Sequence, residues 1–207
     1  MKKELYILVL IAYFVASACG CKKPVELARY ELLPQEIALI PYEKGQKIKF
    51  KHSNGYEFLF EVTEDNLEWK EDHKFTEMTF CSPNYWSYQQ KNVKLQLSYP
   101  NISFDLSIKG RNNERFYSND SIYNSLNINM SDSFSGSFSY DSVFNILAEK
   151  QNIVINGIEY QDVIKIKLNN NSVPNPTLTM PEYLLYNTEF GILQFNYTDN
   201  ENYTLVR

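Results

Sequence analysis

Apolar and polar residues alternate one by one over most of the chain after residue 47, and this period of two constrains the fold more than any other feature. Successive side chains of an extended strand point to opposite faces, so each alternating run has one apolar face and one polar face. Runs of this kind are typical of antiparallel sheets with one face on a core and the other in water. They cover residues 47–51, 56–62, 93–99, 102–109, 153–155, 158–168, 193–197 and 203–206.

Turn and helix signals between these runs indicate the same fold class. Asn54-Gly55 and Asn156-Gly157 each separate two alternating runs and favour the positive φ angles of a type I′ hairpin turn. Helix signals are few: Pro34-Gln35-Glu36 starts a short helix that ends before Pro41, and residues 142–150 form a short helix or an extra strand. The sequence therefore predicts a mostly β single domain of antiparallel strands, as a curved sheet or a sandwich, with one or two short helices.

Two stretches interrupt the alternation. Residues 110–142 and 169–181 are rich in Asn and Ser, and the second stretch also contains several Pro. Because alternation resumes after each stretch, we interpret them as long loops or loosely packed edge hairpins and not as domain linkers. Phe134, Phe138 and Tyr140 alternate with Ser and predict a strand inside the first stretch.

Composition excludes several classes of function. Aromatic residues make up 15% of the 207 residues, which excludes a disordered chain, and the length suits one domain and not a multidomain enzyme. With 20 Lys and Arg against 25 Asp and Glu, the chain lacks the basic footprint of a nucleic-acid binder. The chain has only two His and three Cys, and it has no Gly-rich phosphate loop. Few residues are therefore suited to catalysis or metal binding, and we expect no catalytic centre, metal or cofactor.

The N-terminus has the order of a secretory signal. Lys2 and Lys3 precede an apolar stretch from Leu5 to Phe14, and small residues follow at positions 16–18. Carried to residue 18, the apolar stretch has about 14 residues, short of the ~20 that a membrane-spanning helix needs. We therefore expect residues 1–18 to be a cleaved signal peptide.

Ala16-Ser17-Ala18-Cys19 resembles the lipobox of bacterial lipoproteins, although the usual Leu three places before the Cys is here an Ala. The resemblance implies that Cys19 carries a diacylglycerol thioether and becomes the first mature residue. Acyl chains such as palmitate then anchor the protein in a membrane. Two alternatives stay open: lipidation at Cys21 in a second register, and an ordinary cleaved signal with an incidental Cys.

The position of the lipid also divides the chain. With Cys19 lipidated, residues 19–33 are a lipidated leader and residues 34–207 are the β-rich domain. In that case Cys21 and Cys81 remain, and an exported protein can pair them in a disulfide. A single buried Cys81 with no partner is the alternative.

Three further segments are similar to those of short Bacteroidota cell-envelope lipoproteins. They are Ile40-Pro41-Tyr42 with the 47–50 strand and the Ser53-Asn54-Gly55 turn, the stretch 155–163, and a closing hairpin with Tyr186-Asn187-Thr188-Glu189-Phe190-Gly191-Ile192. The resemblance implies a lipoprotein of the outer membrane or cell surface with no defined activity, so it indicates fold and location without indicating chemistry. It also implies O-glycosylation at Ser121 and Ser142, since each follows an Asp and precedes an apolar residue; a chance match is the alternative.

The two histidines give no clear site. His73 lies among Glu71, Asp72 and Lys74, and we interpret this segment as a solvated charged loop or edge and not as a metal site. His52 lies beside the Asn54-Gly55 turn, where we expect an exposed turn-flanking side chain. A spatial arrangement with a distant nucleophile stays open, because catalytic triads are set by geometry and not by order in the sequence.

One aromatic segment is the best candidate for binding. Tyr85, Trp86 and Tyr88 have amide neighbours, and together with Trp69 they are predicted to form a stacking platform for a sugar. The alternative is that these rings fill a core or cover a sheet edge.

These observations favour a lipid-anchored envelope protein, in the outer membrane, that acts as a non-catalytic binding module toward a glycan or an envelope partner. A second hypothesis is a carrier that holds a lipid or other apolar ligand in a β cavity. A hydrolase whose residues assemble only in space has the least support.

Intact-mass analysis of the protein from its native host tests both expected modifications. Lipidation at Cys19 gives a chain that lacks residues 1–18 and carries the mass of a diacylglycerol with or without a further acyl group. O-glycosylation at Ser121 and Ser142 adds hexose-type masses, which disappear in the Ser121→Ala/Ser142→Ala variant. An unlipidated mature chain contradicts the first expectation, and the absence of any hexose-type mass contradicts the second.

Overall fold

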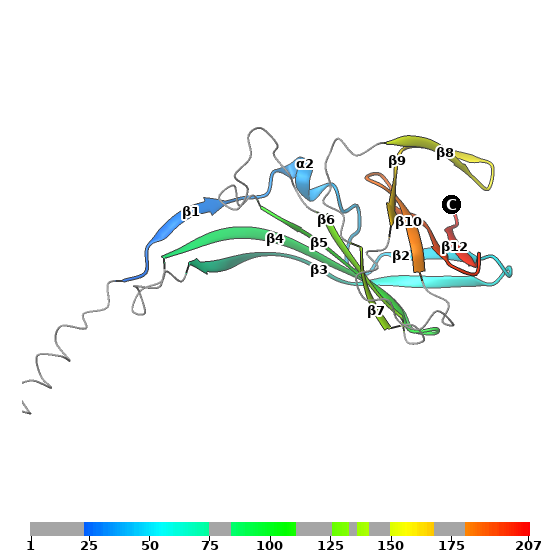
Figure 1. The fold of residues 1–207 in the computed structure, drawn as a ribbon, viewed down its shortest axis with the longest axis horizontal. Coiled ribbons are helices and arrows are strands. Elements are labelled where there is room, and N and C mark those ends of the chain that lie inside the picture. Colours follow the sequence, from blue (N-terminus) through cyan, green and yellow to red (C-terminus); the bar gives the residue numbers. More distant parts are fainter. Residues whose placement is uncertain (1–22, 75–83, 111–125, 133–135, 141–149, 168–180) are drawn as a thin grey trace, which may run out of the picture.

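The computed structural model describes residues 23–74, 84–110, 126–132, 136–140, 150–167 and 181–207. Figure 1 shows their strands and the short helix. The bounds are β1 Glu26–Tyr30, α2 Pro34–Ile37, β2 Lys47–His52, β3 Glu57–Lys74, β4 Asn84–Leu97, β5 Ile102–Lys109, β6 Leu126–Asp132, β7 Gly136–Tyr140, β8 Gln151–Ile155, β9 Ile158–Lys167, β10 Pro181–Asn187, β11 Gly191–Tyr197 and β12 Asn202–Leu205.

The strands form one open antiparallel sheet, which confirms the predicted fold class. Its order is β7-β6-β5-β4-β3-β2-β12-β11-β10-β9-β8, and β1 lies off this path, paired in parallel with β4. The predicted strands are present, including one inside the Asn-rich stretch, where β6 and β7 form an edge hairpin. The predicted helix at Pro34 is α2, while the predicted helix or strand at 142–150 lies outside the described residues except for its last residue.

The sheet is curled so strongly that strands far apart in its order face each other. Phe104 on β5 and Phe195 on β11 are five strand positions apart, which would separate them by about 24 Å in a flat sheet. Their ring centroids are only 5.0 Å apart. The concave face therefore closes on itself and builds its own core without a second sheet.

Aromatic rings fill the middle of this core. Phe195 contacts Phe50, Phe60 and Phe104 through tilted or edge-to-face arrangements and stacks on Tyr203 at a centroid distance of 4.6 Å. Each such aromatic pair stabilises the fold by about 0.5–1.5 kcal/mol beyond the contribution of the buried area. The alternating runs supply these rings because their apolar positions all face the concave side.

A segment from Leu32 to Tyr42, which we call the strap, covers the concave face and contains α2. Leu32, Ile40 and Tyr42 are buried with the side chains of the sheet. The Tyr186 hydroxyl of β10 donates to the Leu39 carbonyl at 2.6 Å, and the Tyr42 hydroxyl accepts from the Ile192 amide of β11 at 2.6 Å. Burial raises the pKa of the Tyr42 and Tyr186 hydroxyls well above the usual tyrosine range, so both stay neutral in the folded protein.

Lys91 of β4 also holds the strap, at Ile37 and Ile40. The buried ammonium of Lys91 donates to the carbonyl oxygens of Ile40 at 2.9 Å and Ile37 at 3.4 Å, and lies 3.8 Å from a carboxylate oxygen of Asp65. Ile37 ends the short helix and its carbonyl also accepts from the Ile40 amide at 3.3 Å. A cation is a favourable donor to carbonyls at the C-terminal end of a helix. The strap therefore joins β4 to β10 and β11 across the curl of the sheet.

A second, smaller cluster lies on the other face of β10 and β11. Leu185 and Leu193 pack there with residues of the β8–β9 hairpin such as Tyr160 and Val163. The first half of β9 pairs with β8 and the second half with β10, and Asp162 adopts a positive φ of 54° between them. This bend places Val163 in the second cluster and Ile164 in the main core, so the hairpin folds over the sheet (Figure 1).

Three details differ from the sequence predictions. The predicted leader 19–33 contains β1, whose pairing with β4 makes it part of the sheet, so the domain begins before residue 34. The turn at Asn54-Gly55 has a positive φ only at Gly55, so it is not type I′ but a longer turn closed by the His52–Tyr56 pair. Asn156-Gly157 has positive φ at both residues, as type I′ requires.

Gly191→Ala tests the contact between the strap and β11. A Cβ on Gly191 would lie against the buried Tyr42 hydroxyl, and Gly191 has a φ of +78°. We expect a loss of about 3 kcal/mol in the free energy of unfolding, from overpacking together with backbone strain. Gly45→Ala is the matched control, because Gly45 has a φ of +86° and open space around it. Its expected loss is about 1 kcal/mol, and equal losses in urea titrations of the two variants would contradict the role of the Tyr42 contact.

Candidate functional site: an exposed face of the β1–β4–β3 arm

The outer parts of β3 and β4, together with β1, extend beyond the curled sheet as a three-stranded arm (Figure 1). β3 and β4 pair continuously from Glu64↔Lys94 to Lys74↔Asn84, and β1 pairs with the part of β4 around Trp86. Neither face of the arm lies on the main core, so no apolar alternation marks the arm and the sequence did not predict it. Residues 71–74, for which we expected a charged loop or edge, form the end of β3.

The strand register sorts the arm's side chains into two faces. Directly paired residues point to the same side of a sheet. Trp69, Glu71 and His73 on β3 are therefore on the same face as their partners Gln89, Ser87 and Tyr85 on β4, and Arg29 of β1 pairs with Ser87. We call this set, Arg29, Trp69, Glu71, His73, Tyr85, Ser87 and Gln89, the arm face. It continues the side of β4 that carries Val93 and Leu95 in the core.

The indole ring of Trp69 is exposed on the arm face and is held in place by a cation. The Arg29 guanidinium carbon lies 4.0 Å from the centroid of the Trp69 ring. Arg29 reaches the ring across Ser87, whose short side chain leaves space between the rows on either side. Such a contact contributes about 0.5–1 kcal/mol at an exposed site and fixes the orientation of the indole, which is still 38% exposed.

Polar groups surround this stack. The Gln89 side-chain oxygen accepts a hydrogen bond from the Leu32 amide at 3.0 Å, which ties the arm face to the start of the strap. The His73 imidazole nitrogen Nε2 lies 3.6 Å from a carboxylate oxygen of Glu71, and its ring lies 5.8 Å from that of Tyr85. The arm face thus presents two aromatic rings, an imidazole, a guanidinium, a carboxylate and an amide on one exposed surface.

The predicted platform of four aromatic residues is divided between the two faces. Trp69 and Tyr85 lie on the arm face, whereas Trp86 and Tyr88 point to the opposite face because they alternate with Tyr85 and Ser87. Trp86 is only 7% exposed. Tyr88 is partly buried, with the Lys109 ammonium 5.7 Å from its ring centroid. The structure therefore does not bring the four rings together on one surface.

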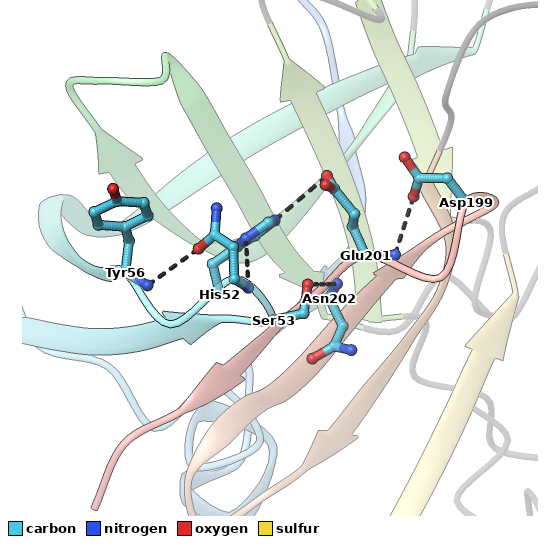
Figure 2. Close-up of polar contacts among 7 residues, drawn as sticks. His52, Ser53, Tyr56, Asp199, Glu201 and Asn202 are labelled. Carbon is cyan, nitrogen blue, oxygen red and sulfur yellow. Dashed lines mark hydrogen bonds and ion pairs between the residues drawn. The ribbon is translucent and has the colours of Figure 1, made fainter.

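His52 is buried, contrary to the expectation of an exposed turn-flanking residue. Its ring packs against Tyr203 at 4.5 Å, while Nδ1 accepts from the Asn54 amide at 3.2 Å and Nε2 lies 3.4 Å from a Glu201 carboxylate oxygen. Figure 2 shows the contact between His52 and Glu201, which links the β2–β3 turn to the β11–β12 turn. Nε2 joins the two turns through Glu201, whereas Nδ1 bonds within the β2–β3 turn itself.

Ser53, next to His52, does not complete a catalytic arrangement with it. The Ser53 hydroxyl oxygen accepts from the Asn202 amide at 3.4 Å (Figure 2). The Ser53 amide donates to the Asn202 carbonyl at 2.9 Å. Since these contacts, like the one between His52 and Glu201, connect one turn with the other, we interpret this cluster as structural.

The remaining sequence-predicted sites lie outside the described residues. They are the lipidation candidates Cys19 and Cys21, the thiol of Cys81, and the glycosylation candidates Ser121 and Ser142. Among the described residues, no three His, Cys, Asp or Glu side chains gather in a geometry suited to a metal ion. In the same part of the chain, no helix has the length and apolar character needed to cross a membrane.

Comparisons with known proteins add no assignment. No protein-family model, no curated protein and no solved structure matches this chain. The arm face therefore has to be interpreted from its own chemistry.

Fluorescence quenching tests the division of the two tryptophans between faces. The chain has two Trp, so Trp86→Phe leaves Trp69 and Trp69→Phe leaves Trp86. We expect acrylamide to quench Trp69 several times more strongly than Trp86, because Trp69 is exposed and Trp86 is buried. Arg29→Ala in the Trp86→Phe background should increase quenching further by uncovering the indole. Equal quenching of the two single-Trp proteins would contradict the assigned faces.

Proposed function

We propose that this chain is a lipid-anchored protein of the cell envelope, in the outer membrane, that acts as a non-catalytic binding module and takes a glycan on the arm face. The observation that carries the proposal is the Arg29–Trp69 stack on an exposed sheet face, bordered by Glu71, Tyr85 and Gln89.

The chemistry of the arm face suits a sugar. The apolar face of a pyranose ring packs on an exposed aromatic ring, and its hydroxyl groups bond with carboxylate, amide and guanidinium groups nearby. Trp69 supplies the ring, while Glu71, Gln89 and Arg29 supply acceptors and donors on both sides of the small Ser87. Because the Arg29 contact already orients the indole, less conformational freedom is lost when a ligand binds.

The position of β1 supports an anchored arm. β1 begins at Glu26, which pairs with Tyr85 close to the end of the arm, and Tyr85 also pairs with His73 near the end of β3. A lipid on Cys19 is seven residues before Glu26, so an extended chain spans at most about 25 Å between them. The proposed anchor would keep the arm face near the membrane surface, where envelope glycans are concentrated.

The aromatic core gives less support to the carrier hypothesis. A carrier would use its Phe and Tyr side chains to line a cavity, but Phe60, Phe104 and Phe195 pack against one another across the curl. The strap then covers this packed region with Ile40 and Tyr42. We therefore favour binding on the arm face over binding inside the sheet.

Glycan-array binding of the full chain tests the proposal. Trp69→Ala and Arg29→Ala should each weaken binding about tenfold, which corresponds to the loss of about 1.4 kcal/mol. Arg29 lies on β1, on the far side of β4 from the free edge of β3, so its variant changes the arm face alone. Tyr88→Ala, on the opposite face of the same arm, is the control and should bind like the unmodified chain.

Two results would contradict the proposal. One is that the unmodified chain retains no glycan, and the other is that Tyr88→Ala weakens binding as much as Trp69→Ala. Far-UV circular dichroism of each variant shows whether its strands are intact, so that unfolding is separated from loss of contact.

A further inference from the structure

The outer part of β3 has an open backbone edge. On one side it pairs with β4 from Glu64 to Lys74. On the other side β2 pairs with β3 only up to Glu61, and the Gly45 and Gln46 backbone bonds with Val62 end the contact. Within the part of the chain that the structure describes, no strand pairs with this edge beyond Val62. An open edge of this kind is a template for another strand.

A second copy of the same edge fits it in only half of the conceivable registers. In an antiparallel ladder, directly opposite residues either both point their backbone groups at each other or both point them away. Two copies related by a twofold axis satisfy this condition only when the residue numbers of opposite residues differ by an even number. The symmetry axis then passes through a residue of β3. The choice is therefore which residue of β3 lies on the axis.

The order of charges along β3 selects Trp69. With Trp69 on the axis, Glu68 lies opposite Lys70 of the second copy, and Asp65 lies opposite His73. Every residue from Asp65 to His73 then has a partner, and no two charges of like sign are opposed.

Other axes that keep a long overlap oppose like charges. An axis through Glu68 or Glu71 opposes two glutamates, and an axis through Lys70 opposes two lysines. An axis through Asp72 opposes two aspartates. An axis through Leu67 opposes no like charges, but it pairs only the nine residues from Thr63 to Glu71, because Val62 is already bonded to Gly45 and Gln46. The Trp69 axis can pair the eleven residues from Glu64 to Lys74. Opposite charges in cross-strand pairs stabilise a sheet and like charges destabilise it, so the sequence is self-complementary in one long register.

Apolar exposure on the same edge agrees with this register. Trp69 is 38% exposed and Leu67 is 50% exposed, and both point to the arm face. With Trp69 on the axis, the two indoles lie side by side, and each Leu67 lies diagonally next to the indole of the other copy. Diagonal neighbours across a pair of strands are within reach of aromatic and long side chains.

We propose that two copies of this chain form a symmetric dimer by antiparallel pairing of their β3 edges, with Trp69 at the twofold axis. The two arms then become one continuous sheet in the order β1-β4-β3-β3-β4-β1. Charged residues on an edge strand ordinarily prevent such pairing, but here their order along the strand permits it in one register. The inference goes beyond glycan binding and does not rest on it.

Charge exchange tests the dimer by sedimentation velocity of the full chain in detergent. The unmodified chain should sediment as a dimer at tens of micromolar. Glu68→Lys opposes two lysines and Lys70→Glu opposes two glutamates, so each variant alone should raise the dimer dissociation constant at least tenfold. A mixture of the two variants should recover the dimer, because lysines at 68 and 70 of one copy then face glutamates at 70 and 68 of the other.

Two further variants complete the test. The double variant Glu68→Lys/Lys70→Glu should dimerise like the unmodified chain, and Glu159→Lys makes the same change of charge on β9 and should leave the dimer intact. Recovery in the mixture also shows that the single variants are folded, since unfolded chains would not regain the dimer. A monomeric unmodified chain, a dimer that persists in both single variants, or a mixture that stays monomeric would each overturn the proposal.

Discussion

The covering of the concave face by the strap is the constraint on which the rest of the structure depends. A curled sheet leaves its aromatic core open on one side, and the strap closes that side by bonding to β4 through Lys91 and to β10 and β11 through Tyr186 and Tyr42. These strands are far apart in the sheet, so the strap also holds the curl. Hydrogen bonds from a charged donor such as Lys91 contribute about 1.5–3 kcal/mol, more than neutral ones.

The extent of the core that the strap covers also determines which part of the sheet stays exposed. Lys91 marks the end of the core on β4, and beyond it the side of β4 that carries Val93 and Leu95 continues into the exposed arm face. Residues of the arm therefore do not pack in the main core, and their sequence is polar with isolated aromatic residues. The Arg29–Trp69 stack, the polar residues around Ser87 and the free β3 edge all belong to this region, so both proposals concern the arm.

Sequence reasoning succeeded where strands face a core and failed where they do not. Alternation located β2, β5 and β9, because in each of them buried residues alternate with exposed or partly exposed ones. It stopped β3 at Val62, since the outer part of that strand faces solvent on both sides and reads as a charged loop. It also placed β1 in a leader, because a short parallel strand at the edge of an arm leaves no periodic pattern. Three of the four predicted aromatic residues are close in sequence, but neighbours on a strand point to opposite faces, so the four rings do not share one surface.

The sequence by itself determined the mostly β class, the core strands and the short helix at Pro34, because periodicity and turn residues act locally. Only the tertiary structure decided that one sheet curls into its own core, that His52 joins two turns, and that Trp69 and Tyr85 share a face that Trp86 does not. These features depend on the register between strands and on which residues meet across the curl. Register is a relation between distant segments, so the residue pattern of one segment does not predict it.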